Sequence, residues 1–435
     1  MKKLLFISLF SFFSVEIQAQ SLYFPPKVGD NWETVSPASL GWCVDKIDSL
    51  YNFLEQENTK GFIVLKDGKI VLEKYFGTFT ADSSWYWASA GKTITSFLVG
   101  QAQEDGLLSV NDTSSKYLGE GWTNCTANNE SSIAIRNQLT MTSGLDDEVI
   151  DNHCTIDTCL NCIAEAGTRW AYHNAPYTLL EKVLENASGQ SINSLTQLKL
   201  KSPTGMTGFW FTVDYDNVYF SKARSMARFG LLIQNNGIWE ADTLIKDTTY
   251  LHQMVNTSQT FNKSYGYLWW LNGKDSYMIP GFQMVIPGSY APQAPLDMIA
   301  GLGKNGQIVS ISKQKGLVVV RMGNQPSSPS VEIATIFCNQ IWEKLNRVIC
   351  DASVVEEPKS IIIKLEIIPN PAKDQLCVKV PSNGDFSIEI SDVRGKIVMK
   401  IENESTIDIS ALCDGFYFIV LKQNETIFVG KLIKQ

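Results

Sequence analysis

The sequence contains very little histidine, and this scarcity excludes the most familiar kinds of hydrolase site. Only His153, His173 and His252 occur among the 435 residues. No Gly-x-Ser-x-Gly segment is present, so the chain lacks the serine of a conventional Ser-His-Asp triad in an α/β-hydrolase. So few histidines also form no metal-ligand cluster, and the sequence predicts neither a metal site nor a cofactor.

The chain also lacks an excess of positive charge, and it contains no low-complexity segment. Lys and Arg number 37 against 45 Asp and Glu, which gives a formal net charge of −8. Such a chain has no basic field that would attract phosphate backbones, so we expect no nucleic-acid partner. Hydrophobic residues make up 44% of the chain and aromatic residues 11%. This composition is enough to bury a large core, and the length favours more than one domain.

Long apolar runs are absent after the first twenty residues. Lys2 and Lys3 precede an apolar run from Leu4 to Val15, and Ile17-Gln-Ala19 has the small residues of a cleavage site. This pattern predicts a signal peptide over residues 1–20. The run is shorter than the roughly 20 residues that span a bilayer, so a retained membrane anchor is the lesser alternative. We expect no transmembrane segment after signal removal.

Nine cysteines in an exported chain permit disulfide bonds. Cys154, Cys159 and Cys162 lie close together, which predicts at least one local disulfide, with Cys125 as a further candidate partner. The odd number leaves one cysteine unpaired. The alternative, a zinc site, lacks a second pair of ligands at a matching spacing. We therefore interpret these cysteines as structural.

The segment from residue 21 to about residue 345 mixes strand and helix patterns. Residue types that are common in β-strands flank Asp67-Gly68, and this pattern predicts a hairpin over Gly61–Leu72. Apolar residues at helical spacing predict helices over 93–103 and 175–187, each followed within a few residues by glycine. The β-branched runs at 307–312 and 317–321 predict a second hairpin.

The sequence pattern changes near residue 361. Short alternating strands are predicted at 386–390, 396–400 and 415–421. The polar stretch 351–361 is interpreted as a linker. The expected order is a signal peptide (1–20), a mixed α/β domain (21–350), the linker and a small all-β domain (362–435).

A serine and a lysine three residues apart form the first candidate site. Ser89 and Lys92 lie in WASAGKTITS, where a helical pattern begins, and residues at this spacing face the same way on a helix. An amine whose pKa is lowered by burial can take the proton of a serine hydroxyl. A helix N-terminus favours both the neutral amine and the forming alkoxide. The alternative is that Ser89 caps the helix while Lys92 points into water.

Two later segments carry groups that suit the same chemistry. In an extended stretch, Tyr172 and Asn174 project from one face, where the tyrosine can relay a proton and the amide can hold a substrate and the lysine. In AGLGKNGQ, Lys304 supplies a positive charge and Gly306 lets a ligand approach the backbone. The alternatives are a buried aromatic for Tyr172, an N-cap for Asn174 and an ordinary hairpin turn for the third segment.

Together these segments resemble the serine β-lactamases and penicillin-binding-protein-like hydrolases, in particular the esterase and class C-like branch. The resemblance covers roughly residues 35 to 345 and rests on Ser89-Ala-Gly-Lys92, Tyr172-His-Asn174 and Lys304-Asn-Gly306, in the family's order. It implies an α/β (α+β) fold in which a helical lobe meets an antiparallel sheet flanked by helices. The active site would lie in the cleft between them.

The resemblance also implies a role for each residue. Ser89 would attack a carbonyl and become acylated, Lys92 would accept its proton, and Tyr172 would pass a proton to the leaving group. The residues expected to bind the substrate are Asn174, Lys304, Gly306 and Gln307. The backbone amides of Ser89 and Gln307 would form the oxyanion hole.

One position departs from the family pattern and shapes the prediction of function. Asn305 stands where strict β-lactamases and transpeptidases usually have Thr or Ser, which weakens the expectation of β-lactam or substrate-carboxylate recognition. We therefore predict a serine hydrolase that cleaves an ester or amide and is carboxylesterase-like or D-amino-acid amidase-like. The alternatives are a β-lactamase or peptidoglycan DD-peptidase and, from another class, a non-catalytic surface binding protein on the same scaffold.

The end of the chain carries a second set of ordered segments. They are Ile368-Pro-Asn-Pro-Ala372, Asp392-Val-Arg-Gly-Lys396, Ile407-Asp-Ile-Ser-Ala-Leu412, Gly415-Phe-Tyr417 and Lys431-Leu-Ile-Lys434. They resemble the C-terminal sorting domain of the type IX secretion system of Bacteroidetes. The resemblance implies contact with that machinery and a place at the cell surface or outside the cell. The alternative is a small β-sandwich that binds carbohydrate or protein; in either case Cys377 and Cys413 are expected to link its two sheets.

Overall fold

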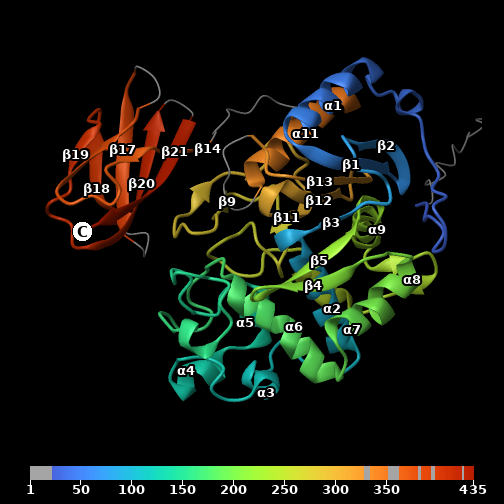
Figure 1. Cartoon of the computed structure of the whole chain (residues 1–435), viewed down its shortest axis with the longest axis horizontal. Helices are drawn as coiled ribbons and strands as arrows, with labels where there is room; N and C mark the ends of the chain where they lie inside the picture. Colours follow the sequence, from blue (N-terminus) through green and yellow to red (C-terminus); the bar gives the residue numbers. More distant parts are fainter. Residues whose placement is uncertain (1–21, 328–333, 351–361, 381–383, 393–396, 424–425) are drawn as a thin grey trace, which may run out of the picture.

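The computed structural model describes residues 22–327, 334–350, 362–380, 384–392, 397–423 and 426–435. A large mixed domain precedes a smaller unit of strands (Figure 1). The predicted signal peptide and linker lie outside the described residues.

Helices account for much of the larger domain. They are α1 (Ile47–Gln56), α2 (Lys92–Glu104), α3 (Ser115–Leu118), α4 (Ala127–Ser132), α5 (Ile135–Leu139), α6 (Asn174–Ser188), α7 (Ile192–Thr196), α8 (Ser202–Thr204), α9 (Ala223–Gln234), α10 (Thr248–Met254) and α11 (Thr335–Ile349). The predicted helices over 93–103 and 175–187 are confirmed as α2 and α6. Gly189 ends α6 in the left-handed conformation, as a C-terminal glycine does.

A six-stranded antiparallel sheet forms the centre of this domain. Its strands, in spatial order, are β2 (Lys69–Tyr75), β1 (Thr59–Lys66), β13 (Leu317–Gly323), β12 (Gln307–Ser312), β11 (Ile299–Gly303) and β8 (Trp270–Leu271). Both predicted hairpins are confirmed, as β1–β2 and β12–β13. Asp67 and Gly68 adopt positive φ angles of 49° and 85° in the first turn, which suits this residue pair.

Helices cover both faces of the central sheet (Figure 1). Side chains alternate along a strand, so neighbouring residues of β12 contact different layers. On one face the Trp342 indole of α11 donates a hydrogen bond to Ser310 Oγ over 3.3 Å. On the other face α9 approaches so closely that a Cβ at Gly230 would lie 3.2 Å from Val309 of β12 and 2.4 Å from Val318 of β13. The main hydrophobic core therefore lies on both sides of this sheet.

The second lobe of the domain is built around α2 and α6. Helix α6 packs against α2, α3, α5 and α7. Every residue of α2 from Lys92 to Ala102 is buried, so this helix passes through the interior rather than lying on the surface. A charged residue at its first position is therefore carried into the protein.

Three small sheets complete the larger domain. The sheet β3-β5-β4 is formed by β3 (Ser84–Tyr86), β5 (Asp216–Lys222) and β4 (Phe209–Val213). The pairs are β6 (Ile238–Trp239) with β7 (Asp242–Thr243), and β9 (Ser276–Tyr277) with β10 (Ile286–Pro287).

The C-terminal unit consists of two sheets around one small core. The strands are β14 (Ile362–Lys364), β21 (Thr426–Lys434), β20 (Gly415–Gln423), β17 (Phe386–Asp392) and β18 (Ile397–Glu402) in one sheet, and β15 (Ile367–Ile368), β16 (Gln375–Val378) and β19 (Thr406–Asp408) in the other. The three strands predicted here are thus present, although residue 396 lies outside the described residues.

The disulfide bonds partly follow the prediction. Cys125–Cys162 and Cys154–Cys159 confirm the local cluster. The third bond, Cys43–Cys350, joins two ends of the larger domain and was not predicted.

The expectation of a single unpaired cysteine is wrong, because Cys338, Cys377 and Cys413 are all free. The predicted link between Cys377 and Cys413 is wrong as well. On β16 the alternation turns Leu376 and Val378 into the core and leaves Cys377 exposed, so its thiol does not face the other sheet.

Candidate active site

A short turn before α2 presents the candidate nucleophile. Ser89 lies in η3 (Ala88–Gly91), immediately before Lys92 begins the α-helix. The preceding Trp87 fixes this turn: its backbone N–H donates to Tyr219 O and its indole donates to Ser221 Oγ, both over 2.8 Å. Trp87 is fully buried, so a rigid aromatic anchor holds the backbone beside the serine.

Strand β11 closes the other side of the turn. A Cβ at Gly303 would lie only 2.4 Å from Trp87 O and 3.0 Å from the backbone nitrogen of Ala90. Only glycine allows the strand to pass so close. The end of β11, with Lys304 directly after it, therefore lies beside the serine.

Lys92 connects the serine to the second motif. Its Nζ donates to Ser89 Oγ over 2.9 Å and to Asn174 Oδ1 over 2.8 Å. The lysine is 3% exposed. The expected contact between Ser89 and Lys92 is confirmed, and the alternative in which the lysine points into water is wrong.

Two tyrosine rings surround the lysine amine. Nζ lies 5.1 Å from the ring centre of Tyr172 and 4.1 Å from that of Tyr177, distances at which a cation and an aromatic face attract each other. Tyr172 is 2% exposed, and its ring stacks on Trp270 with 6.1 Å between centres. The tyrosine of the second motif thus reaches Lys92 from the core side.

A cavity of about 360 Å³ opens over the serine. Its lining residues are Tyr86, Ala88, Ser89, Lys92, Asp151, His153, Asn174, Tyr177, Asp214, Tyr215, Asp216, Asn217, Val218 and Lys304. The structure thus brings together four residues predicted from the sequence: Ser89, Lys92, Asn174 and Lys304. Tyr172, Gly306 and Gln307 do not line this cavity.

Gly306 and Gln307 instead contact the interior. Asn305 turns the chain with a φ of 62°, and buried Arg321 donates to the carbonyl oxygens of Asn305 and Gly306 over 2.7 and 3.1 Å. The Gln307 side chain pairs with the backbone of Gly323. Their position follows from the chain path. Gly306 ends the turn after β11, and Gln307 begins β12, which is one strand farther from the serine than β11.

Several cavity residues were not found from the sequence. His153 Nδ1 lies 2.6 Å from Asp216 Oδ2, and His153 Nε2 lies 3.2 Å from Asn174 Nδ2. Asp214 lies in the turn between β4 and β5, and Asp216 is the first residue of β5. The sequence signals a turn there through Asp214-Tyr-Asp-Asn217, but it contains nothing that places this turn beside Ser89.

A buried carboxyl group lies behind the cavity. Glu181 is 2% exposed and accepts from Asn217 Nδ2 over 2.7 Å and from Tyr177 Oη over 3.3 Å. Burial raises the pKa of Glu181 to about 8, although its two hydrogen bonds and the charge of Lys92 act in the opposite direction. Glu181 is therefore mostly protonated at neutral pH.

Two further titratable groups differ in their charge. Burial alone would raise the pKa of Asp216, but contact with His153 and the charge of Lys92 bring it below its usual value. Burial, with smaller effects of the nearby charges of Arg169 and His153, lowers the pKa of His173 to about 3. Asp216 is thus an anion at neutral pH, whereas His173 is neutral.

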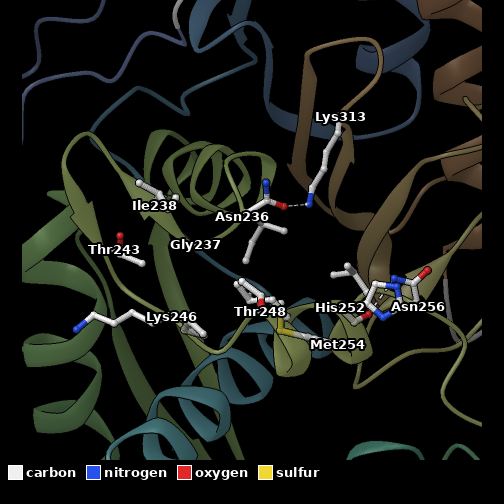
Figure 2. Close-up of a pocket in the computed structure, with 14 residues that line it drawn as sticks. Asn236, Gly237, Ile238, Thr243, Lys246, Thr248, His252, Met254, Asn256 and Lys313 are labelled. Atoms are coloured by element: carbon white, nitrogen blue, oxygen red, sulfur yellow. Dashed lines mark hydrogen bonds between the residues drawn. The ribbon is translucent and has the colours of Figure 1, made fainter.

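A second, larger cavity of about 560 Å³ lies elsewhere, lined largely by α10 and by the loops around Gly237 and Lys246 (Figure 2). Lys313 Nζ donates to Asn236 Oδ1 over 2.5 Å at its rim. None of the residues of the three motifs lines it. Size alone would favour this cavity, but the chemistry of the lining favours the smaller one as the candidate active site.

The described residues contain neither a candidate metal cluster nor a helix that could span a membrane. No group of three or more His, Cys, Asp and Glu side chains within them could hold a metal ion. None of the helices in this part of the chain has the length and apolar character needed to cross a membrane.

The fold and the residues of this cavity are those of a hydrolase class with the beta-lactamase fold. Comparison with family models agrees: residues 53–337 match the model described as Beta-lactamase, so the chain belongs to the beta-lactamase family. Residues 366–435 match the model described as Secretion system C-terminal sorting domain. A domain of this kind directs type IX secretion to the cell surface or beyond.

Individual relatives are distant. PbpX of Bacillus subtilis, provisionally assigned as a penicillin-binding protein, is 23% identical over 295 residues, which are 62% of this chain and 73% of PbpX. A Bacillus anthracis protein provisionally assigned as a 6-aminohexanoate-dimer hydrolase is similar in structure, with a TM-score of 0.56 and 17% identity; the match covers 75% of this chain and 91% of that one. A family VIII carboxylesterase gives a TM-score of 0.55 and 13% identity over 73% and 99% of the two chains. At these identities the structural matches show the fold alone.

The raised pKa of Glu181 predicts a pH-dependent stability. The folded protein keeps this proton up to about pH 8, whereas an unfolded glutamate releases it near pH 4.3, so the free energy of unfolding should fall with rising pH between these values. Glu181→Gln removes this contribution, and its amide fits the same two partners. Relative to Glu181→Gln, the wild type should lose roughly 1.4 kcal/mol per pH unit across the window.

Urea unfolding at several pH values measures this difference, with exposed Glu120→Gln as the matched control. A wild-type-minus-variant difference that does not change between about pH 5 and pH 8 would show that Glu181 is not held protonated.

Proposed function

We propose that this protein is a serine hydrolase that cleaves an ester or amide through an acyl intermediate on Ser89. The observation that carries the proposal is the buried amine of Lys92, which is within hydrogen-bond distance of both Ser89 Oγ and Asn174 Oδ1. A nucleophile, a base within reach and a group that orients the base form the general arrangement of an activated serine.

The proposed roles follow from these contacts. Lys92, in its neutral form, accepts the proton of Ser89 as the hydroxyl oxygen attacks the substrate carbonyl. Asn174 holds the amine in place, and Tyr172, beside Lys92, helps to return the proton to the leaving group. Water then attacks the acyl-serine and releases the acid. Lys304 adds positive charge at the mouth of the site.

The oxyanion hole is proposed at the backbone N–H of Ser89 and the backbone where β11 meets Lys304. Support comes from the close approach of Gly303 to the turn that carries the serine. The sequence-based proposal used Gln307 for this purpose, but Gln307 lies on β12 and does not line the cavity. Donors must be aimed at the forming oxyanion to be effective.

The cavity favours a small substrate without a carboxylate. Its volume is about 360 Å³, which suits a short acyl group. Asp151, Asp214 and Asp216 line it together with only two lysines, so an anionic substrate meets repulsion. A short-chain carboxylesterase or a D-amino-acid-type amidase is therefore proposed ahead of a β-lactamase or DD-peptidase.

Labelling with a fluorophosphonate tests the nucleophile. Purified wild type should gain the mass of one adduct and hydrolyse p-nitrophenyl acetate. Ser89→Ala should gain no adduct and lose at least about 10³-fold in kcat/KM, because no acyl intermediate can form. Ser84→Ala, an exposed serine nearby on β3, is the control and should behave as wild type.

Intact mass and turnover of p-nitrophenyl acetate and nitrocefin decide among the alternatives. Preferred turnover of nitrocefin would support the β-lactamase. A folded wild type without adduct or turnover would contradict the proposal and favour the non-catalytic binding protein.

For localisation, we propose export in two steps, with the predicted signal peptide used at the inner membrane and residues 362–435 at the outer membrane. Support comes from the sorting-domain match over residues 366–435. The partner would be the type IX machinery, and the protein would act at the cell surface or in the medium.

Deleting residues 362–435 tests this route in a bacterium with type IX secretion. The truncated chain should accumulate inside the outer membrane, while full-length Ser89→Ala should be exported like wild type because only its activity is lost. Cell fractionation with immunoblotting measures both. Equal amounts of truncated and full-length chain outside the cells would contradict the proposed role of the tail.

A further inference from the structure

A histidine and an aspartate that belong to none of the three motifs line the same cavity as Ser89. His153 Nδ1 lies 2.6 Å from Asp216 Oδ2. The other oxygen of Asp216 accepts from Thr178 Oγ1 of α6 over 3.2 Å, so the carboxylate is tied to the scaffold. Both side chains are partly buried: that of Asp216 is 27% exposed and that of His153 is 41% exposed.

The loop that carries the histidine is itself anchored beside the second motif. The backbone N–H of Ala175 donates to Asn152 O over 2.9 Å, and the His153 N–H donates to Asp151 Oδ1 over 3.0 Å. The next residue, Cys154, is bonded to Cys159. The imidazole therefore occupies a defined position rather than the tip of a free loop.

The imidazole reaches Lys92 through a single amide group. Asn174 Oδ1 accepts from Lys92, while Asn174 Nδ2 donates to Asn152 Oδ1 over 3.0 Å and lies 3.2 Å from His153 Nε2. An amide nitrogen has two hydrogens. Both find acceptors when His153 carries its proton on Nδ1, toward Asp216, and leaves Nε2 unprotonated.

We propose that His153, held by Asp216, is a positioning residue that keeps the oxygen of Asn174 directed at Lys92. The inference rests on the proposed function of Ser89 and Lys92. The pair is not a Ser-His-Asp triad, because the hydrogen bond described for Ser89 Oγ comes from Lys92. Its effect on the serine passes through Asn174 and the lysine.

This arrangement makes the site sensitive to acid. A protonated imidazole places an N–H opposite the N–H of Asn174, and the amide can accept that hydrogen only by rotating. Rotation turns its nitrogen toward Lys92 and removes the acceptor there. The titratable groups that line the cavity with His153 are Asp151, Asp214, Asp216, Lys92, Lys304, Tyr86, Tyr177 and Tyr215, and the buried His173 interacts electrostatically with His153.

The test compares the pH profiles of kcat and KM for p-nitrophenyl acetate between about pH 5 and pH 9. His153→Gln offers a permanent acceptor oxygen in place of Nε2; it should retain wild-type kcat at high pH and lose the acidic decline. His153→Ala should lose about five-fold in kcat at high pH with little change in KM, because one hydrogen bond to Asn174 is gone. His252→Gln, in the other cavity (Figure 2), is the matched control and should keep the wild-type profile.

The possible results separate this inference from the proposed function. If wild type acts through Ser89 and both His153 variants match its kcat and its pH profile, the positioning role is wrong while the hydrolase stands. If wild type and Ser89→Ala hydrolyse the ester equally, the proposed function fails and the positioning role fails with it. Loss of the acidic decline in His153→Gln, with wild-type kcat retained at high pH, supports the role.

Discussion

The structure of the site depends on one constraint: a lysine amine must be kept in the interior. Lys92 is 3% exposed, and moving an amine out of water is costly unless hydrogen bonds replace the lost hydration. Ser89 Oγ and Asn174 Oδ1 provide two acceptors, and the faces of Tyr172 and Tyr177 surround the amine. The same contacts that make burial tolerable place a base next to the candidate nucleophile.

Several other parts of the fold hold this arrangement in place. Helix α2 is buried along most of its length, so its first residue lies where two lobes meet. The approach of β11 at Gly303 fixes the opposite wall, and Arg321 holds the turn after it through the carbonyl groups of Asn305 and Gly306. We expect a change in any of these supports to alter the geometry around Ser89 although none of them is the serine itself.

The sequence predicted those parts that depend on local spacing. The contact between Ser89 and Lys92 follows from helix geometry. Asn174 was expected to reach the lysine from an extended stretch shared with Tyr172, and it does contact Lys92, but as the first residue of α6. The strands β12 and β13 were predicted from apolar runs. What could not be predicted depends on distant segments. The order of strands in the sheet decides which strand lies beside the serine. Gln307 was expected at the oxyanion hole, but it lies on β12 and does not line the cavity.

The same limit explains the other misses. His153 and Asp216 are far apart in the chain and carry no motif, so only the folded loop brings them together. The bond between Cys43 and Cys350 spans 307 residues. By contrast, the cysteines within residues 125–162 were predicted to pair because they are close in sequence. For the C-terminal unit the strands were predicted, but the outward orientation of Cys377 depends on strand register.

The most direct test of the central claim is the rate of Ser89 acylation in Lys92→Met, measured as the initial burst of p-nitrophenol in stopped flow. Methionine fills a similar volume without a charge, so the folded state should persist, and thermal unfolding checks this. If the buried amine activates the serine, acylation should slow by about 10²- to 10⁴-fold. An acylation rate within about three-fold of wild type in the folded variant would contradict the account.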